Sequence, residues 1–170
     1  MDKIKNILRF AMRMEKDAGD FYNYYMDKVQ SENTRELFRE LSKIEEEHYN
    51  ILKSKFDELG YNEPPVTISW VVDNNFAAKD PHIISDSSDI AGNSGGDVSD
   101  LTVMRMAYLI ENDFAEFYKN AVNVVEEPEV KNFLETLAYW EEQHKQMFFE
   151  RYQSLLKKHW SDISSIIFAK

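Results

Sequence analysis

The sequence contains no cysteine, only 5 Gly and 4 Pro in 170 residues, and no long apolar run. The absence of cysteine excludes a disulfide framework, a thiolate zinc site, an iron–sulfur cluster and a nucleophilic cysteine. A β-sandwich or barrel needs Gly and Pro at its many turns, so their scarcity argues against both folds. No segment approaches the ~20 apolar residues that a membrane-spanning helix needs. Residues 1–5 lead into an amphipathic pattern, which is not typical of a signal peptide.

The chain has few basic residues for its acidic ones: 20 Lys and Arg and 31 Asp and Glu give a net charge of −11. This balance argues against nucleic acid or an anionic membrane as a partner. With 43% hydrophobic and 14% aromatic residues, the chain has enough apolar side chains for a sizeable core. We therefore expect one soluble, cytoplasmic, mostly helical domain over residues 1–170.

Four stretches carry core-type residues at alternating steps of three and four, and this periodicity predicts four helices. The helices form two pairs, at about residues 1–60 and about 100–157. The connector at about 61–99 lacks the periodicity, and its residues 66–72 are a candidate extended piece. In the tail at about 158–170, residues 161–170 are a candidate for one further short helix around Ile163, Ile166 and Ile167.

Local signals predict where the helices begin and end. Asn33 is a candidate N-cap for the second helix, with Glu36 three residues later. Gly60 is expected to end that helix. The third helix is expected to start near Asp100, and Pro128 marks the first turn of the fourth.

The two helix pairs are copies of each other. A shift of 96 positions superimposes them without a gap, placing Ala11 on Ala107, Glu15 on Glu111, Phe21 and Tyr22 on Phe117 and Tyr118, Leu41 on Leu137, Glu45 on Glu141, and His48 on His144. If the copies pair about a pseudo-twofold axis, the second and third helices run parallel. The chain must then travel ~38 Å, the length of a helix of ~25 residues, and the long connector allows this. The sequence thus predicts an all-α four-helix bundle made of two duplicated helix hairpins joined by a long crossover connection.

Six polar residues occupy helix positions where the pattern calls for apolar ones: Glu15, Glu45, His48, Glu111, Glu141 and His144. A carboxylate moved into a bundle core costs several kcal/mol, and facing carboxylates raise one another's pKa. No basic residue lies on these stripes near the glutamates, but two divalent metal ions would neutralise four carboxylates. One Glu from each of two helices, with Glu-x-x-His from each of the other two, is the di-iron or di-manganese carboxylate pattern. The alternative is a decayed site with protonated or solvated glutamates.

Other polar and aromatic residues carry weaker signals. Tyr22 and Tyr118 lie seven residues after Glu15 and Glu111, on the same helix faces. Their hydroxyl groups could orient the ligating glutamates, or the rings could simply belong to the core. The remaining residues near the motifs are interpreted as solvated or surface residues: Glu46, Glu47, Glu142, Gln143, His82 and His159.

The pattern of Glu15 with Phe21-Tyr22, Glu45-x-x-His48, Glu111 with Phe117-Tyr118, and Glu141-x-x-His144 resembles the ferritin-like superfamily, and within it the rubrerythrin-like branch. The resemblance covers about residues 1–60 and 100–157. It implies two iron ions, with manganese as the other candidate metal. Glu45 and Glu141 would bridge the ions; Glu15 and His48 would complete the ligands of one, and Glu111 and His144 those of the other.

Family members with this site reduce hydrogen peroxide or dioxygen, or oxidise ferrous iron. Two departures from the family pattern bear on the activity. The chain has no cysteine-ligated rubredoxin-like iron centre, so a separate electron-donor protein would be needed. Phe114 occupies the position where rubrerythrins usually carry an extra glutamate. Without that glutamate the two ions have equivalent ligands, which is closer to the bacterioferritin pattern.

Three functions stay open at this point. The favoured one is an oxidoreductase that reduces hydrogen peroxide or dioxygen, like a rubrerythrin-type peroxidase. The second is a ferroxidase or iron-handling protein that uses the same site. The third is an interaction module with a vestigial metal site, whose working surface would be the connector. A homodimer is expected because helical bundles with an exposed apolar face often dimerise.

Overall fold

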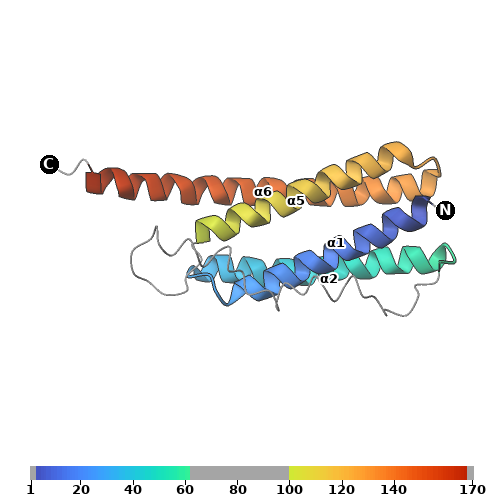
Figure 1. The fold of residues 1–170 in the computed structure, drawn as a ribbon, viewed down its shortest axis with the longest axis horizontal. Helices are drawn as coiled ribbons and strands as arrows, with labels where there is room; N and C mark the ends of the chain where they lie inside the picture. Colours follow the sequence, from blue (N-terminus) through green and yellow to red (C-terminus); the bar gives the residue numbers. More distant parts are fainter. Residues whose placement is uncertain (1–2, 62–99, 168–170) are drawn as a thin grey trace. The chain divides into compact units, whose positions relative to one another are not determined.

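The structure is a computed structural model that describes residues 3–61 and 100–167; after Ser161, only Ser164 is described with its side chain. Four helices make up nearly all of the described residues: α1 Lys3–Met26, α2 Glu32–Glu58, α5 Asp100–Val124 and α6 Pro128–Ile167 (Figure 1). No strand occurs in these two ranges, so the predicted all-α class is confirmed. The extended piece expected at 66–72, and the connector beyond Tyr61, lie outside the described residues.

The helices belong to two compact units, one of residues 8–98 and the other of residues 1–7 and 99–170. In the first unit α1 and α2 are antiparallel, as three contacts show. Tyr22 lies against Phe38 with 5.3 Å between ring centroids, and a Cβ atom built on Gly19 would lie 3.5 Å from Cβ of Glu45. The guanidinium of Arg35 donates to the carbonyl of Met26, 3.2 Å away. The predicted first hairpin is therefore present.

The start of α2 differs from the prediction. Ser31, not Asn33, is the N-cap, and its hydroxyl oxygen accepts a hydrogen bond from the backbone N–H of Thr34 at 3.4 Å. Serine and asparagine cap helices about equally well, so the residue type alone does not choose between them. Arg35, in the first turn, also donates to the carbonyl of Val29 at 3.2 Å, which ties α2 to the preceding turn.

The end of α2 agrees with the prediction from Gly60. Gly60 has φ +74°, a conformation that side chains with a Cβ rarely adopt. Its N–H donates to the carbonyl of Asp57, while the N–H of Tyr61 reaches the carbonyl of Phe56, at 3.0 and 3.1 Å. The rings of Phe56 and Tyr61 then contact each other at 5.2 Å. This pair of bonds with its apolar contact is the Schellman arrangement.

In the second unit α5 and α6 form the other antiparallel hairpin. Lys119 Nζ on α5 lies 2.7 Å from a carboxylate oxygen of Glu142 on α6, and the rings of Tyr108 and Phe149 lie 5.4 Å apart. The first turn of α1 also belongs to this unit, where Lys3 donates to the carbonyl of Val124 at 3.3 Å.

Helix α6 begins at Pro128 as predicted, but it runs unbroken for 40 residues to Ile167. The expectation of a separate short helix in the tail is therefore wrong for the described residues. No Gly or Pro follows Lys157, so nothing in this segment interrupts the backbone hydrogen bonds. Across the described helices, none combines the length and the apolar character that crossing a membrane requires.

Candidate metal centre

Four glutamates lie in the interior of the two hairpins. Glu15, Glu45, Glu111 and Glu141 are each 0% exposed. They interrupt faces that are filled mostly by apolar side chains. The two histidines on the same faces are nearly as enclosed, since the side chains of His48 and His144 are 6% and 15% exposed. A glutamate is almost never fully buried without a charge partner or a metal, so this burial needs a chemical explanation.

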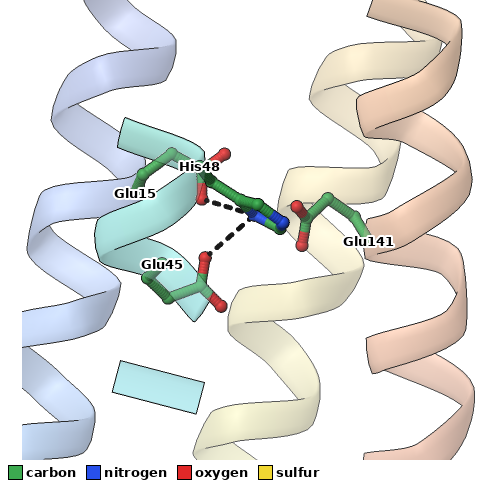
Figure 2. A group of neighbouring side chains, drawn as sticks. All are labelled: Glu15, Glu45, His48 and Glu141. Carbon is green, nitrogen blue, oxygen red and sulfur yellow. Dashed lines mark ion pairs between the residues drawn. The ribbon is translucent and has the colours of Figure 1, made fainter. Parts of the chain in front are cut away.

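In the first hairpin, one glutamate from α1 meets the Glu-x-x-His pair of α2. Nδ1 of His48 lies 3.5 Å from Oε2 of Glu15 and 3.4 Å from Oε2 of Glu45 (Figure 2, dashed lines). Glu45 and His48 are three residues apart, so they project from one side of α2. The antiparallel packing of α1 on α2 brings Glu15 to the same place. We call Glu15, Glu45 and His48 the first triad.

The second hairpin repeats this geometry. Nδ1 of His144 lies 3.5 Å from Oε2 of Glu111, on α5, and 3.4 Å from Oε2 of Glu141, on α6. We call Glu111, Glu141 and His144 the second triad. In each triad the same imidazole nitrogen faces the same carboxylate oxygens at the same two distances. The duplication seen in the sequence therefore extends to the placement of individual ligand-type atoms.

The spacing within each triad fits a shared metal ion. Charge-assisted hydrogen bonds between nitrogen and a carboxylate are about 2.7–2.9 Å long, shorter than any of the four distances. Two ligand atoms, each about 2.1 Å from one ion, lie about 3.0–3.4 Å apart when the angle at the ion is about 90–109°. In each triad, the two carboxylates and the imidazole offer atoms that all lie within 4.8 Å of one another. Oxygen with imidazole nitrogen is a donor set that suits iron and manganese.

Burial and charge shift the protonation of the second triad. Burial raises the pKa of Glu111 to about 7, although the imidazole of His144 beside it acts in the opposite direction. Burial lowers the pKa of His144, but the carboxylates of Glu111 and Glu141 outweigh it and raise that pKa to about 9. Without a metal, His144 is therefore protonated at neutral pH. Metal binding requires the neutral imidazole, so it must release this proton.

The two tyrosines singled out in the sequence are completely buried. Tyr22 and Tyr118 are each 0% exposed. Each contacts the phenylalanine before it edge to face, with ring centroids 5.5 Å apart for Phe21 and Tyr22 and 5.3 Å apart for Phe117 and Tyr118. These ring contacts account for the packing of both residues. The role of their hydroxyl groups in orienting glutamates stays a prediction.

Most residues beside the triads lie at the surface, as expected. Glu46, Glu47, Gln143 and His159 are exposed, whereas His82 lies outside the described residues. Glu142 differs from the expectation of a merely solvated residue. Its carboxylate receives hydrogen bonds from Lys119 and Lys145, and these lower its pKa. Only Lys145, three residues along the same helix, could have been anticipated from sequence spacing.

The family comparison agrees with the fold. The family model for Rubrerythrin matches residues 6–152, a range that includes most of both hairpins and all six triad residues. No curated protein and no solved structure matches the chain. The match and the four described helices together support the ferritin-like, all-α fold class. The chain therefore belongs to the rubrerythrin family.

Proposed function

We propose that this protein is a di-metal carboxylate oxidoreductase that reduces hydrogen peroxide or dioxygen with electrons from a separate donor protein. The observation that carries the proposal is the repeated triad, in which Nδ1 of a histidine faces two fully buried carboxylates at 3.4 and 3.5 Å. Membership of the rubrerythrin family supports iron as the metal, with manganese as the other candidate. The predictions of a cytoplasmic location and of a homodimer stay predictions.

The six triad residues are proposed to hold two ions together, one ion completed by Glu15 and His48 and the other by Glu111 and His144. Glu45 and Glu141 are the proposed bridging ligands. Four carboxylates carry a charge of −4, which two divalent ions neutralise. Bound in this way, the ions would supply two electrons and stabilise negative charge on the oxygen of the substrate. With the ions bound, the chain would hold these carboxylates ionised and the two imidazoles neutral, away from water.

Metal loading would change the protonation of the second triad. Without a metal, this triad holds protons near neutral pH, because the pKa of Glu111 is raised to about 7 and that of His144 to about 9. Metal ligands are ionised carboxylates and neutral imidazoles, so these protons would leave when the ions bind. The hydroxyl groups of Tyr22 and Tyr118 are proposed to orient the glutamates and keep their oxygen atoms in place.

A second function, ferrous-iron oxidation and iron handling, is favoured by one residue. Phe114, which is 7% exposed, occupies the position where rubrerythrins usually carry an additional glutamate. The two triads then have the same composition, Glu-Glu-His, without a seventh ligand on one side. A symmetric pair of sites is closer to the bacterioferritin pattern. Iron handling would use the same six residues but would release the oxidised iron.

Rapid mixing of the ferrous-loaded protein with either hydrogen peroxide or dioxygen distinguishes these functions. The oxidoreductase proposal predicts that peroxide oxidises the bound iron faster than it oxidises free ferrous ion, and that the iron stays bound. Release of ferric iron, with more than two irons oxidised per chain, would favour iron handling. Oxidation no faster than that of free ferrous ion would contradict both. A vestigial site, the remaining alternative, predicts no binding of divalent metal at all. The matched control is Glu46→Gln, which changes an exposed glutamate next to Glu45.

A further inference from the structure

A series of aromatic rings connects the interior of the first hairpin with its surface. The ring centroids of Tyr22 and Phe21 lie 5.5 Å apart, those of Phe21 and Tyr25 lie 4.7 Å apart, and those of Tyr25 and Tyr24 lie 5.0 Å apart. Phe38, on α2, lies 5.3 Å from Tyr22 and 6.3 Å from Phe21. We call Tyr22, Phe21, Tyr25 and Tyr24 the aromatic ladder.

The three tyrosines become more exposed from the inner to the outer end of the ladder, while Phe21 between Tyr22 and Tyr25 is itself partly exposed. Tyr22 is 0% exposed and Tyr25 is 6% exposed, whereas Tyr24 is partly exposed. At the outer end the ammonium group of Lys28, an exposed residue, lies 3.9 Å from the centroid of the Tyr24 ring. At the inner end, Tyr22 follows Glu15 of the first triad by seven residues, about 10 Å along the helix axis. The ladder therefore runs from the hairpin interior, about 10 Å along the helix axis from Glu15, to solvent.

The duplicated hairpin lacks the outer part of the ladder. The shift of 96 positions places Phe21 and Tyr22 on Phe117 and Tyr118, which keep the same edge-to-face contact. The other equivalent positions carry no aromatic residue: Asn120 corresponds to Tyr24, Ala121 to Tyr25 and Leu134 to Phe38. Both hairpins fold with comparable buried faces. Packing alone therefore does not require two neighbouring phenols at positions 24 and 25.

Three of the four ladder side chains are phenols. Tyr24 and Tyr25 contact each other directly, and the ring of Phe21 lies between Tyr25 and Tyr22. A phenol can lose one electron together with its O–H proton and form a neutral phenoxyl radical, whereas a benzene ring resists this oxidation. Electron transfer between such groups weakens steeply with distance, so contacts of about 5 Å between rings favour it. Burial, with Tyr24 adding to it, raises the pKa of Tyr25, so this phenol is protonated at neutral pH. It must therefore give up its proton together with its electron.

We propose that the aromatic ladder passes single electrons inward from Tyr24 at the surface to Tyr22 in the interior of the first hairpin. The role of this route in peroxide reduction rests on the proposed function, whereas conduction along the ladder does not. Hydrogen peroxide needs two electrons and two protons to become two water molecules, so two successive transfers serve one peroxide. In each transfer Tyr22 gives one electron and its phenol proton towards the reduction of peroxide and becomes a phenoxyl radical. Because Phe21 carries no exchangeable proton, this radical regains only the electron from Tyr25, across the Phe21 ring, and takes its proton from water. Tyr25 releases its own proton and is reduced in turn by Tyr24. A soluble reductant, such as a thiol, restores the Tyr24 phenol.

The test uses metal-free protein, so it does not depend on the proposed function. Because the chain has no cysteine, an Asp27→Cys variant can carry a ruthenium photo-oxidant at one place only. Tyr22 is replaced by 3-aminotyrosine, which is easier to oxidise and therefore traps the radical. The matched control is Asn123→Cys with 3-aminotyrosine replacing Tyr118, since both label positions are exposed and equivalent in the two copies. After a laser flash, transient absorption follows the aminotyrosyl radical.

The proposal predicts faster trapping at position 22 than at position 118, and loss of this advantage in Tyr24→Phe and Tyr25→Phe variants. Each of these variants keeps its ring and removes only the hydroxyl group, and circular dichroism checks that the helices remain. Equal trapping rates in the two hairpins, or rates unchanged by both substitutions, would overturn the ladder. If the ladder conducts but the protein binds no metal, only the proposed function fails. If metal binds and peroxide is reduced while the ladder does not conduct, only this inference fails.

Discussion

Nδ1 of His48 on α2 lies 3.5 Å from Oε2 of Glu15 on α1, within a hairpin whose other core positions are largely apolar. His144 and Glu111 repeat this relationship, with the same pair of atoms at the same distance. A contribution to the stability of the fold does not explain either pair. A buried ion pair usually contributes little once desolvation is counted, and apolar residues would fill the space at lower cost. The two pairs are explained if the hairpins are built to bind metal.

Replacing one central carboxylate tests the ligand assignment. We expect Glu45→Gln to weaken metal binding by more than about 100-fold, the upper end of the effect of losing an outer-shell partner. Glutamine keeps the volume of the side chain but removes the anionic oxygen. Isothermal titration with Mn²⁺ measures the change, and Glu46→Gln is the exposed control. Equal weakening in both variants would mean that only the overall charge matters.

Replacing the whole second triad by apolar residues should stabilise the metal-free protein. Glu111 is 0% exposed and has a pKa raised to about 7, so burial disfavours its ionised form. We expect Glu111→Leu combined with Glu141→Leu and His144→Leu, which leaves no unpaired charge in the core, to raise the free energy of unfolding of the metal-free protein by about 1–4 kcal/mol. Urea unfolding measures this, with Glu116→Leu at an exposed position of α5 expected to change it by less than about 0.5 kcal/mol. Destabilisation by the triple substitution would show that the triad is needed for the fold itself.

The metal-free protein should lose stability as the pH rises. The pKa of His144 is raised from 6.5 to about 9 in the folded chain. Between these values the folded state holds a proton that the unfolded state has lost, so the free energy of unfolding falls. This contribution is complete below pH 6.5 and is lost as the pH passes 9. Glu111 adds a loss in the same direction between pH 4.5 and about 7.

Thermal unfolding between pH 6.5 and 9 measures the effect of His144. A His144→Gln variant should show a weaker decline than the unchanged chain. In the metal-loaded protein the imidazole is already deprotonated, so this decline should disappear and proton release should be seen on loading at pH 7. A decline of the same size in the variant would assign it to other groups.

The fold was largely predictable because each helix carries a mainly apolar stripe of regular period, in which the six triad residues are the most conspicuous interruptions. The triads were predictable for the same reason: glutamate and histidine are conspicuous where leucine is expected. For the N-cap of α2, the sequence predicts Asn33, two residues after the observed cap Ser31, because both residue types suit this position. The pairing of Lys119 with Glu142 could not be predicted, because it depends on how α5 and α6 are aligned with each other. The periodicity within one helix carries no information about that alignment. The ladder was not predicted because Phe21 looks like an ordinary packing residue in the sequence.

Phe114 should influence which oxidant the protein prefers. Phe114→Glu restores the glutamate that rubrerythrins usually carry at this position, and we expect it to speed oxidation of the bound iron by peroxide relative to dioxygen. Phe114 is 7% exposed, so the added carboxylate should destabilise the metal-free protein by about 1–3 kcal/mol. Stopped-flow absorbance with each oxidant gives the ratio of rates. Phe114→Gln, equally polar but without the anionic oxygen, should leave that ratio unchanged; a shift in both variants would point to polarity alone.

The central claim is that the two triads bind two metal ions in each chain. An anaerobic titration of metal-free protein with ferrous ion tests it most directly, with circular dichroism confirming that the helices are intact. We predict saturation at two ions per chain, followed by rapid oxidation of both when hydrogen peroxide is added. Intact helices with no bound iron would contradict the claim and leave the four buried glutamates unexplained.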